Sequence, residues 1–162
     1  MKKLSLVIVI ILAFFMINCG GKGTLDLRSP DSKVRVQFKI KDGQAFYRVK
    51  FHDKEVVNWS RLGFRFRYKP ALLNNFTIQD FSMSQKDTVW DPVWGQKDKI
   101  RNNYNELKIK IKESTGLERS MELVFRAYDD GIGFRYILPP QNNLQRVEIT
   151  SEETEFKLDK HN

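Results

Sequence analysis

The sequence predicts an all-β protein built as an antiparallel β-sandwich. Three observations lead to this prediction. Apolar and polar residues alternate over short segments, and Gly, Pro and Asn residues separate these segments at short intervals. Beyond the N-terminal apolar segment, no window has the 3.6-residue period of an amphipathic helix. A period of two places one side of each strand on a core, and many short strands of this kind are typical of a sandwich.

The best-specified part of this sandwich is a hairpin over residues 121–138. Its inward-facing residues are predicted to be Met121, Leu123, Phe125, Ala127, Ile132, Phe134, Tyr136 and Leu138. Asp130-Gly131 is expected to supply the positive φ angles of a tight turn. Asp129 and Asp130 are interpreted as turn formers, because the two carboxyl groups of a glycosidase lie about 5 to 10 Å apart across the sugar and adjacent turn residues point apart.

Further strands are expected on both sides of this hairpin. The first covers Thr24–Arg28, Asp42-Gly43 is a second hairpin turn, and later strands begin at Leu144 and at Thr154. The other predicted inward-facing residues are Val34, Val36, Phe38, Ile40, Tyr47, Val49, Phe51, Leu62, Phe64, Phe66, Tyr68, Leu107, Ile109 and Ile111.

The N-terminus has the pattern of a secretory signal. Lys2-Lys3 precede an apolar run over 4–17, which is shorter than the about 20 residues of a membrane-spanning helix. Ile-Asn-Cys-Gly then resembles a bacterial lipoprotein cleavage box, in which Cys19 becomes the lipidated first residue. We therefore expect an exported protein of the periplasm or outer membrane, lipid-anchored at Cys19, with a tether over 20–23 and a sandwich over 24–162. An ordinary signal with an incidental Cys19 is the alternative.

Charge and cysteine content exclude some classes of protein. The formal net charge is +8, but most Lys and Arg residues alternate with apolar residues along the predicted strands. This pattern indicates a solvated strand face, and nucleic acid is not an expected partner of an exported chain. The one cysteine excludes an intramolecular disulfide.

Polar and aromatic residues gather in one stretch, over 90–107. Aromatic faces and amide groups are what a sugar-binding site uses, by stacking and by planar hydrogen bonding. The candidate residues for substrate binding or a domain interface are Trp90, Trp94, Arg101, Asn102, Asn103 and Tyr104. In the structural alternative, the tryptophans attach a loop to the sheet and the asparagines satisfy its backbone. Neither His52 nor His161 has metal-ligand spacing, and the chain lacks a Gly-rich phosphate loop and a nucleophile elbow.

Three motifs then occur in order: Trp-Asp-Pro-Val-Trp-Gly at 90–95, Ile-Arg-Asn-Asn-Tyr-Asn-Glu-Leu at 100–107, and Phe-Arg-Ala-Tyr-Asp-Asp-Gly-Ile-Gly-Phe-Arg-Tyr at 125–136. Together they resemble the N-terminal domain of glycoside hydrolase family 97, which contains α-glucosidases and α-galactosidases. The segments 27–31 and 154–156 fit the same pattern. The resemblance covers essentially the whole chain after the signal.

The resemblance implies a β-supersandwich of the galactose-mutarotase type, followed in family members by a (β/α)8 catalytic barrel and a C-terminal β domain. The family's catalytic carboxylates lie in the barrel. Its calcium is held by barrel glutamates and by one residue late in the N-terminal domain, beyond Asn162 here. No catalytic or metal residue is therefore carried over. We expect no cofactor in this chain, although calcium is expected in the full-length enzyme, and we expect an incomplete sandwich that is inactive alone.

The leading hypothesis is a non-catalytic sandwich that supports the barrel and the active-site rim in the hydrolysis of α-linked glucosides or galactosides. Its partners are then carbohydrate, a downstream barrel, and the membrane through the lipid anchor. A free-standing, membrane-anchored carbohydrate-binding lipoprotein is a second hypothesis. A hydrolase complete in itself is the third, and the missing acids count against it.

Overall fold

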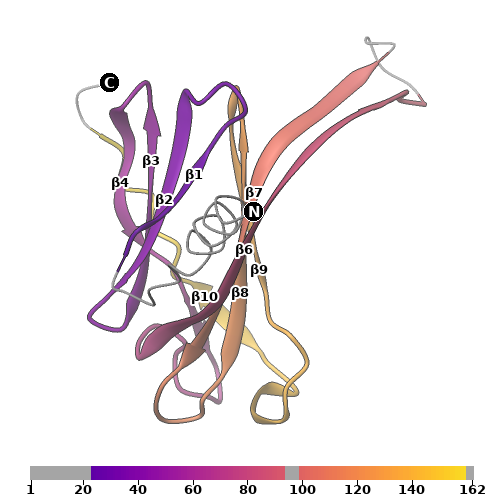
Figure 1. Ribbon diagram of the computed structural model, residues 1–162. Coiled ribbons are helices and arrows are strands. Elements are labelled where there is room, and N and C mark those ends of the chain that lie inside the picture. The colour runs from indigo at the N-terminus through magenta and orange to yellow at the C-terminus, as the bar shows by residue number, and fades with distance from the viewer. Residues whose placement is uncertain (1–22, 94–98, 160–162) are drawn as a thin grey trace, which may run out of the picture.

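The computed structural model describes residues 23–93 and 99–159 (Figure 1). In this part of the chain there is no α-helix, so the prediction of an all-β protein is confirmed. These residues also contain no helix long and apolar enough to cross a membrane. The elements are β1 (Leu25–Arg28), β2 (Val34–Lys41), β3 (Gln44–Phe51), β4 (Lys54–Arg61), β5 (Phe64–Phe66), β6 (Phe76–Trp90), β7 (Ile100–Glu113), β8 (Ser120–Tyr128), β9 (Gly131–Ile137), a 3₁₀ turn at Asn142–Leu144, and β10 (Ile149–Glu152).

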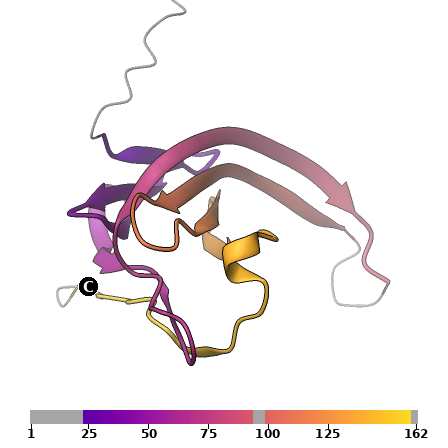
Figure 2. The same ribbon diagram turned by 90° about the horizontal axis from the view of Figure 1, so that it is seen from below.

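Two four-stranded antiparallel sheets form the sandwich. The first has the order β1-β2-β3-β4 and the second the order β6-β7-β8-β9, while β10 pairs with β5 in a small third sheet. Figure 1 shows the two large sheets face to face, and Figure 2 shows β6 and β7 curving away from the sandwich on one side. Neighbouring strands follow one another along the chain because hairpins join them.

The core lies between the two large sheets and is rich in aromatic rings. The ring centre of Tyr47 in β3 lies 6.1 Å from that of Phe125 in β8 and 5.5 Å from that of Phe134 in β9. The ring centres of Phe38 in β2 and Phe125 are 6.3 Å apart. The predicted alternation is confirmed at most positions, including the fully buried Val36, Phe38, Tyr47, Leu107, Ile109, Ile111, Met121, Leu123 and Phe125. Burying these side chains is the main favourable contribution to folding.

The prediction of an inward-facing side chain is wrong for two residues. Phe51 is 45% exposed and Tyr68 is 79% exposed. Phe51 is the last residue of β3, next to the turn at His52, whose ring lies 4.5 Å away. Tyr68 lies beyond the end of β5 at Phe66. In both segments, the alternation of apolar and polar residues continues beyond the region that the opposing sheet covers.

The turn of the central hairpin also differs from the prediction. Tyr128 pairs with Gly131, so the turn residues are Asp129 and Asp130, and positive φ angles occur at neither of them nor at Gly131. A tertiary contact accompanies this turn, since the backbone N–H of Asp31 donates to the Asp129 carboxylate at 2.8 Å.

The Asp42-Gly43 turn agrees with the prediction, with φ angles of 52° and 73°. Such angles favour a two-residue hairpin connection.

The C-terminal strands are shorter than expected. The predicted strand at 144–149 is a 3₁₀ turn up to Leu144, and the strand itself is only β10. No strand forms at 154–156, although the Glu155 N–H donates to the Arg61 carbonyl at 2.9 Å. This segment therefore follows β4 by separate backbone contacts and closes one side of the sandwich.

Candidate functional site

The predicted site residues lie on a two-stranded arm. The pairing of β6 with β7 runs from Phe76 opposite Glu113 to Trp90 opposite Ile100. In contrast, β8 pairs with β7 only as far as Asn105. Beyond that point the two strands extend alone past the sandwich (Figure 1). Trp90, which the structural alternative placed on a loop, is the last residue of β6. Trp94, the other predicted tryptophan, lies outside the described residues.

An ion pair joins the two strands of the arm. Arg101 donates from Nε to Oδ1 of Asp87 at 2.8 Å and from Nη2 to Oδ2 at 2.7 Å. These hydrogen bonds lower the pKa of the Asp87 carboxyl. Both side chains are more than half exposed, so the pair adds little to folding stability.

The distal end of the arm exposes apolar side chains. Val89 is 58% exposed, Trp90 is 51% exposed and Val93 is 98% exposed. Asn102 and Asn103 lie half-buried on β7, opposite Thr88 and Asp87. A group of exposed apolar residues on a projecting element marks an interaction surface.

Tyr104, at the root of the arm, is a packing residue. It is 5% exposed, its ring lies 5.3 Å from that of Tyr128, and the guanidinium of Arg126 lies 4.4 Å from the ring centre. The Arg126 Nε in turn donates to Glu106 at 2.7 Å. The structure thus separates Tyr104 from the exposed candidates Trp90 and Arg101.

A groove of about 560 Å³ lies beside the root of the arm. Asn105 crosses it and donates from Nδ2 to the Arg28 carbonyl at 2.9 Å. Its lining residues are Asp26, Leu27 and Arg28 of β1, Met83, Ser84 and Gln85 of β6, and Asn105 of β7. Planar polar groups of this kind suit carbohydrate hydroxyl groups. Sequence reasoning missed the groove because β1 and β6 meet only through the tertiary fold.

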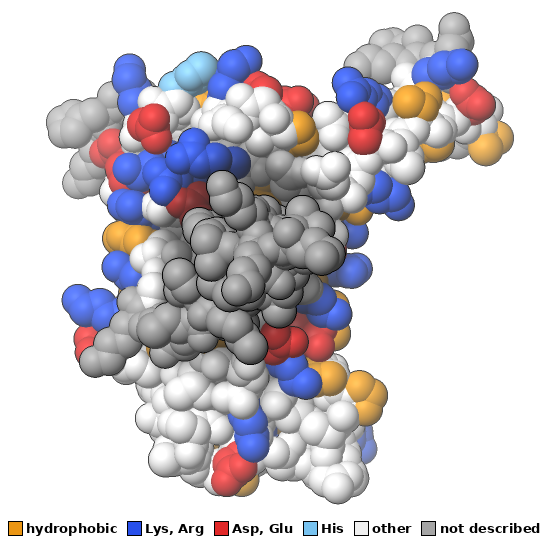
Figure 3. Space-filling view, viewed as in Figure 1, with side chains coloured by type: hydrophobic (Ala, Val, Ile, Leu, Met, Phe, Trp, Pro, Cys, Tyr) orange, Lys and Arg blue, Asp and Glu red, His pale blue; other side chains and the backbone are white. Residues whose placement is uncertain are grey.

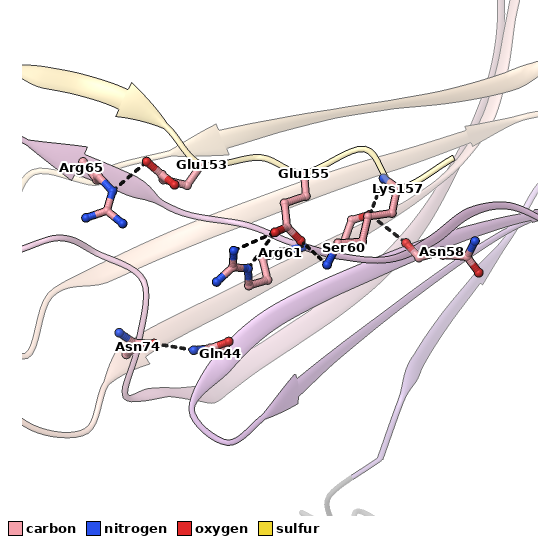
Figure 4. Close-up of polar contacts among 9 residues, drawn as sticks. All are labelled: Gln44, Asn58, Ser60, Arg61, Arg65, Asn74, Glu153, Glu155 and Lys157. Carbon is pink, nitrogen blue, oxygen red and sulfur yellow. Dashed lines mark hydrogen bonds and ion pairs between the residues drawn. The ribbon is translucent and has the colours of Figure 1, made fainter. Parts of the chain in front are cut away.

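A second, smaller polar pocket of about 200 Å³ lies where the C-terminal segment crosses β4 and β5 (Figure 4). Arg61 donates to Glu155 at 2.8 Å and Arg65 donates to Glu153 at 2.8 Å. Gln44 and Asn74 also line the pocket, and Gln44 donates to Asn74 at 2.9 Å. The two ion pairs fasten the C-terminal segment, and no local pattern in the sequence indicated them.

Glu155, which binds Arg61 at the edge of this pocket, has a strongly lowered pKa. Burial raises its pKa, but hydrogen bonds from Arg61 and Lys157 outweigh burial and bring the pKa to about 2. The carboxylate is therefore ionised at any physiological pH, and it acts as a fixed anion that holds β4 to the C-terminal segment.

The described residues do not provide a metal centre. Among them, no three His, Cys, Asp or Glu side chains lie close enough together to hold a metal ion. Asp129 and Asp130 form the hairpin turn, as predicted, and the Asp129 carboxylate accepts a hydrogen bond from the Asp31 backbone N–H.

These features define an antiparallel β-sandwich domain with a projecting two-stranded arm. The profile of the glycosyl-hydrolase 97 N-terminal family matches residues 27–162, and the chain belongs to this family. The resemblance inferred from the three sequence motifs is thereby confirmed.

Similar proteins are much longer than this chain. A retaining alpha-galactosidase from Bacteroides thetaiotaomicron is 23% identical over 137 residues, which are 85% of this chain and 19% of that protein. A glycoside hydrolase family 97 enzyme from Pseudoalteromonas sp. strain K8, solved in complex with panose, has a TM-score of 0.81 and 29% identity over 84% of this chain and 20% of its own. A beta-arabinopyranosidase shares the fold, with a TM-score of 0.75 and 22% identity over 83% of this chain and 21% of its own.

The chain thus spans about a fifth of the length of these relatives. They are enzymes that carry this sandwich as one part. The alternative of a free-standing carbohydrate-binding lipoprotein is not supported by these matches.

Proposed function

We propose that this chain acts as the N-terminal sandwich of a glycoside hydrolase, where it supports a (β/α)8 catalytic barrel and contributes to the active-site rim. The substrates are α-linked glucosides or galactosides. Catalytic acids and calcium are supplied from outside the described residues. The membership of the family and the lengths of the relatives support this role.

The single observation that carries the proposal is the exposed apolar end of the arm. Val89, Trp90 and Val93 project beyond the sandwich, and the described part of the chain leaves each of them more than half exposed. A partner surface that covers them gains about 25 cal/mol for each Å² of apolar area removed from water. Aromatic residues in such positions often dominate an interface.

The first test is the DNA that follows codon 162, where we expect a coding sequence for a (β/α)8 barrel. The second test joins the chain to that barrel and measures hydrolysis of α-glucosides and α-galactosides. We expect hydrolysis by the joined protein and none by the 162-residue chain alone. We expect Trp90→Ala in the joined protein to reduce kcat/KM about tenfold, the loss of one good interface anchor.

Tyr68→Ala is the matched control, because Tyr68 is a 79% exposed aromatic residue that follows β5 and is not part of β6 or β7. This variant is expected to keep the activity of the joined protein. Hydrolysis by the chain alone, or equal activity of Trp90→Ala and the unaltered protein, contradicts the proposed role.

We further propose that the chain is exported and lipid-anchored at Cys19, which lies outside the described residues. The Lys2-Lys3 start, the apolar run and the Cys-Gly pair support this. Metabolic labelling with an alkyne fatty acid is expected to label the chain, and Cys19→Ser is expected to abolish the label. Label retained in Cys19→Ser contradicts the anchor.

A further inference from the structure

The outer face of the β1-β2-β3-β4 sheet carries an excess of positive charge, and we call it the basic face. Figure 3 shows Lys and Arg side chains gathered over β2 and β3. Its acidic residues are Asp26 and Glu55, and Asp53 lies at its edge, 4.0 Å from Arg35. The basic residues of this face are Arg28, Arg35, Lys39, Lys41, Arg48 and Lys50, which alternate with the buried residues of β1, β2 and β3.

Hydrogen bonds hold this face in one arrangement. Arg35 donates to Asp26 at 2.7 Å, and the Gln37 amide donates to the same carboxylate at 2.9 Å. Arg48 donates to Gln37 at 2.6 Å and also to Glu55 at 2.9 Å. These hydrogen bonds link side chains of β1, β2, β3 and β4 and hold this part of the basic face in one arrangement.

An aromatic ring lies within this positive field. Lys39 Nζ lies 3.8 Å from the centre of the Trp59 ring, and the Arg48 guanidinium lies 4.7 Å from it. Burial lowers the pKa of Lys39, and repulsion from Lys41 and Arg48 lowers it further. The local positive charge is therefore not fully compensated by the acids of this face, and a bound anion would relieve the repulsion.

We propose that the basic face lies against an anionic phospholipid surface. A half-buried tryptophan flanked by lysine and arginine is the arrangement that suits a membrane–water interface. Each basic side chain near an anionic membrane raises the binding constant about fivefold. This inference goes beyond the proposed hydrolase role and requires no carbohydrate.

The position of β1 supports the choice of a lipid surface. β1 is the edge strand of this sheet, and its first residue, Leu25, pairs with Phe38, next to Lys39. The proposed anchor at Cys19 is six residues before Leu25, a distance of at most about 20 Å in an extended chain. A membrane that holds this anchor is therefore within reach of the basic face.

The test measures the contact of Trp59 with lipid in the full chain. Trp90→Phe and Trp94→Phe leave Trp59 as the one tryptophan. The chain is added to vesicles with brominated acyl chains, made of phosphatidylcholine with or without phosphatidylglycerol. The same chain, with its N-terminal apolar run, is added to both kinds of vesicle, so the difference in quenching reports the contact of Trp59 with the anionic lipid. We expect stronger quenching with phosphatidylglycerol, decreasing with added salt because exposed charges are screened.

Lys39→Gln with Lys41→Gln is expected to abolish the added quenching. The matched control, Lys108→Gln with Lys110→Gln, removes the same charge from exposed positions on β7 of the other sheet and is expected to keep it. Quenching that does not respond to phosphatidylglycerol overturns the proposal, and so does an equal loss in the control. Protection of Trp59 by an acidic polysaccharide, without a response to the lipid, assigns the face to that partner instead.

Discussion

The guanidinium of Arg119 lies in the protein interior, with Nη2 2.6 Å from Oε1 of Glu113. Arg119 is 1% exposed and Glu113 is 6% exposed. The same guanidinium donates to the carbonyls of Pro70 at 2.7 Å and Ala71 at 3.0 Å. One buried ion pair therefore attaches the loop after β5 to the end of the β7-β8 hairpin.

Replacing Arg119 is expected to destabilise the fold strongly. Arg119→Met leaves the Glu113 carboxylate buried without its partner, and such a change costs about 3–5 kcal/mol of unfolding free energy. Denaturant unfolding followed by circular dichroism measures the loss. Arg119→Met combined with Glu113→Leu is expected to lose less, because no unpaired charge remains. A single variant as stable as the unaltered chain contradicts this explanation.

Gly63 is expected to tolerate no side chain. Its φ angle is 152°, and an added Cβ would lie 2.5 Å from the Leu72 carbonyl oxygen, which accepts a hydrogen bond from Phe64. Gly63→Ala is expected to cost about 2–3 kcal/mol, from strain and a forced shift of this backbone pair. Thermal unfolding tests it against Gly131→Ala, where nothing lies within 4 Å of the added Cβ. Equal melting temperatures for the two variants are the contrary outcome.

Glu155 is expected to make the chain acid-sensitive. Its pKa of about 2 in the folded chain is below the value of about 4.3 in the unfolded chain. A lowered pKa stabilises the fold above about pH 5, and this contribution is lost as the pH falls toward 2. After allowance for solvent screening of this partly exposed group, the contribution is about 1 kcal/mol.

Glu155→Gln is therefore expected to be less stable than the unaltered chain at pH 7 and equally stable near pH 2. Denaturant unfolding across this range makes the comparison. Glu148→Gln is the control for the loss of one carboxylate, since Glu148 lies 3.5 Å from Arg67 in an exposed pair. Parallel pH curves for Glu155→Gln and the unaltered chain argue against the role of Glu155.

Tyr47 is expected to limit stability at alkaline pH. Burial, with a smaller contribution from the Glu155 charge, raises the pKa of its phenol to about 12. The unfolded value is about 10, so the stabilisation is complete below pH 10 and is lost as the pH rises toward 12. Burial likewise raises the pKa of Tyr136, which adds to this effect.

Tyr47→Phe tests this expectation. It removes the hydrogen bond to the Glu155 carbonyl, 2.8 Å long, which costs about 1 kcal/mol at neutral pH. The variant is also expected to lose less stability than the unaltered chain between pH 10 and 12. Tyr68→Phe, at an exposed position, is the control. An unchanged alkaline slope in Tyr47→Phe contradicts the role of Tyr47.

Local patterns in the sequence predicted the sandwich strands because burial of one strand face leaves a period of two. The period locates residues such as Phe38 and Leu123, which the structure buries fully. It fails for Phe51 and Tyr68, whose alternation extends beyond the opposing sheet. The arm shows little of this period of two, because residues 82–91 are exposed on both faces of the strand.

The site depends still more on contacts between distant segments. The motif at 90–95 made Trp90 a candidate for binding or for a domain interface, but it did not predict that Trp90 ends a 15-residue strand. The groove that joins Asp26 to Gln85, and the ion pairs of Glu153 and Glu155, have no local signature. Such contacts become visible only when two strands meet in space.

The sequence by itself determined the fold class and the family, because strand alternation, turn residues and three ordered motifs are all local properties of the chain. The tertiary structure decided which charges are buried and which are presented to solvent. Arg119 and Arg48 are the same residue type, yet one lies in the interior with Glu113 and the other lies on the basic face beside Trp59. The physical reason is that the burial of a charge depends on the partners brought to it by distant strands, and those partners are set by the packing of the two sheets.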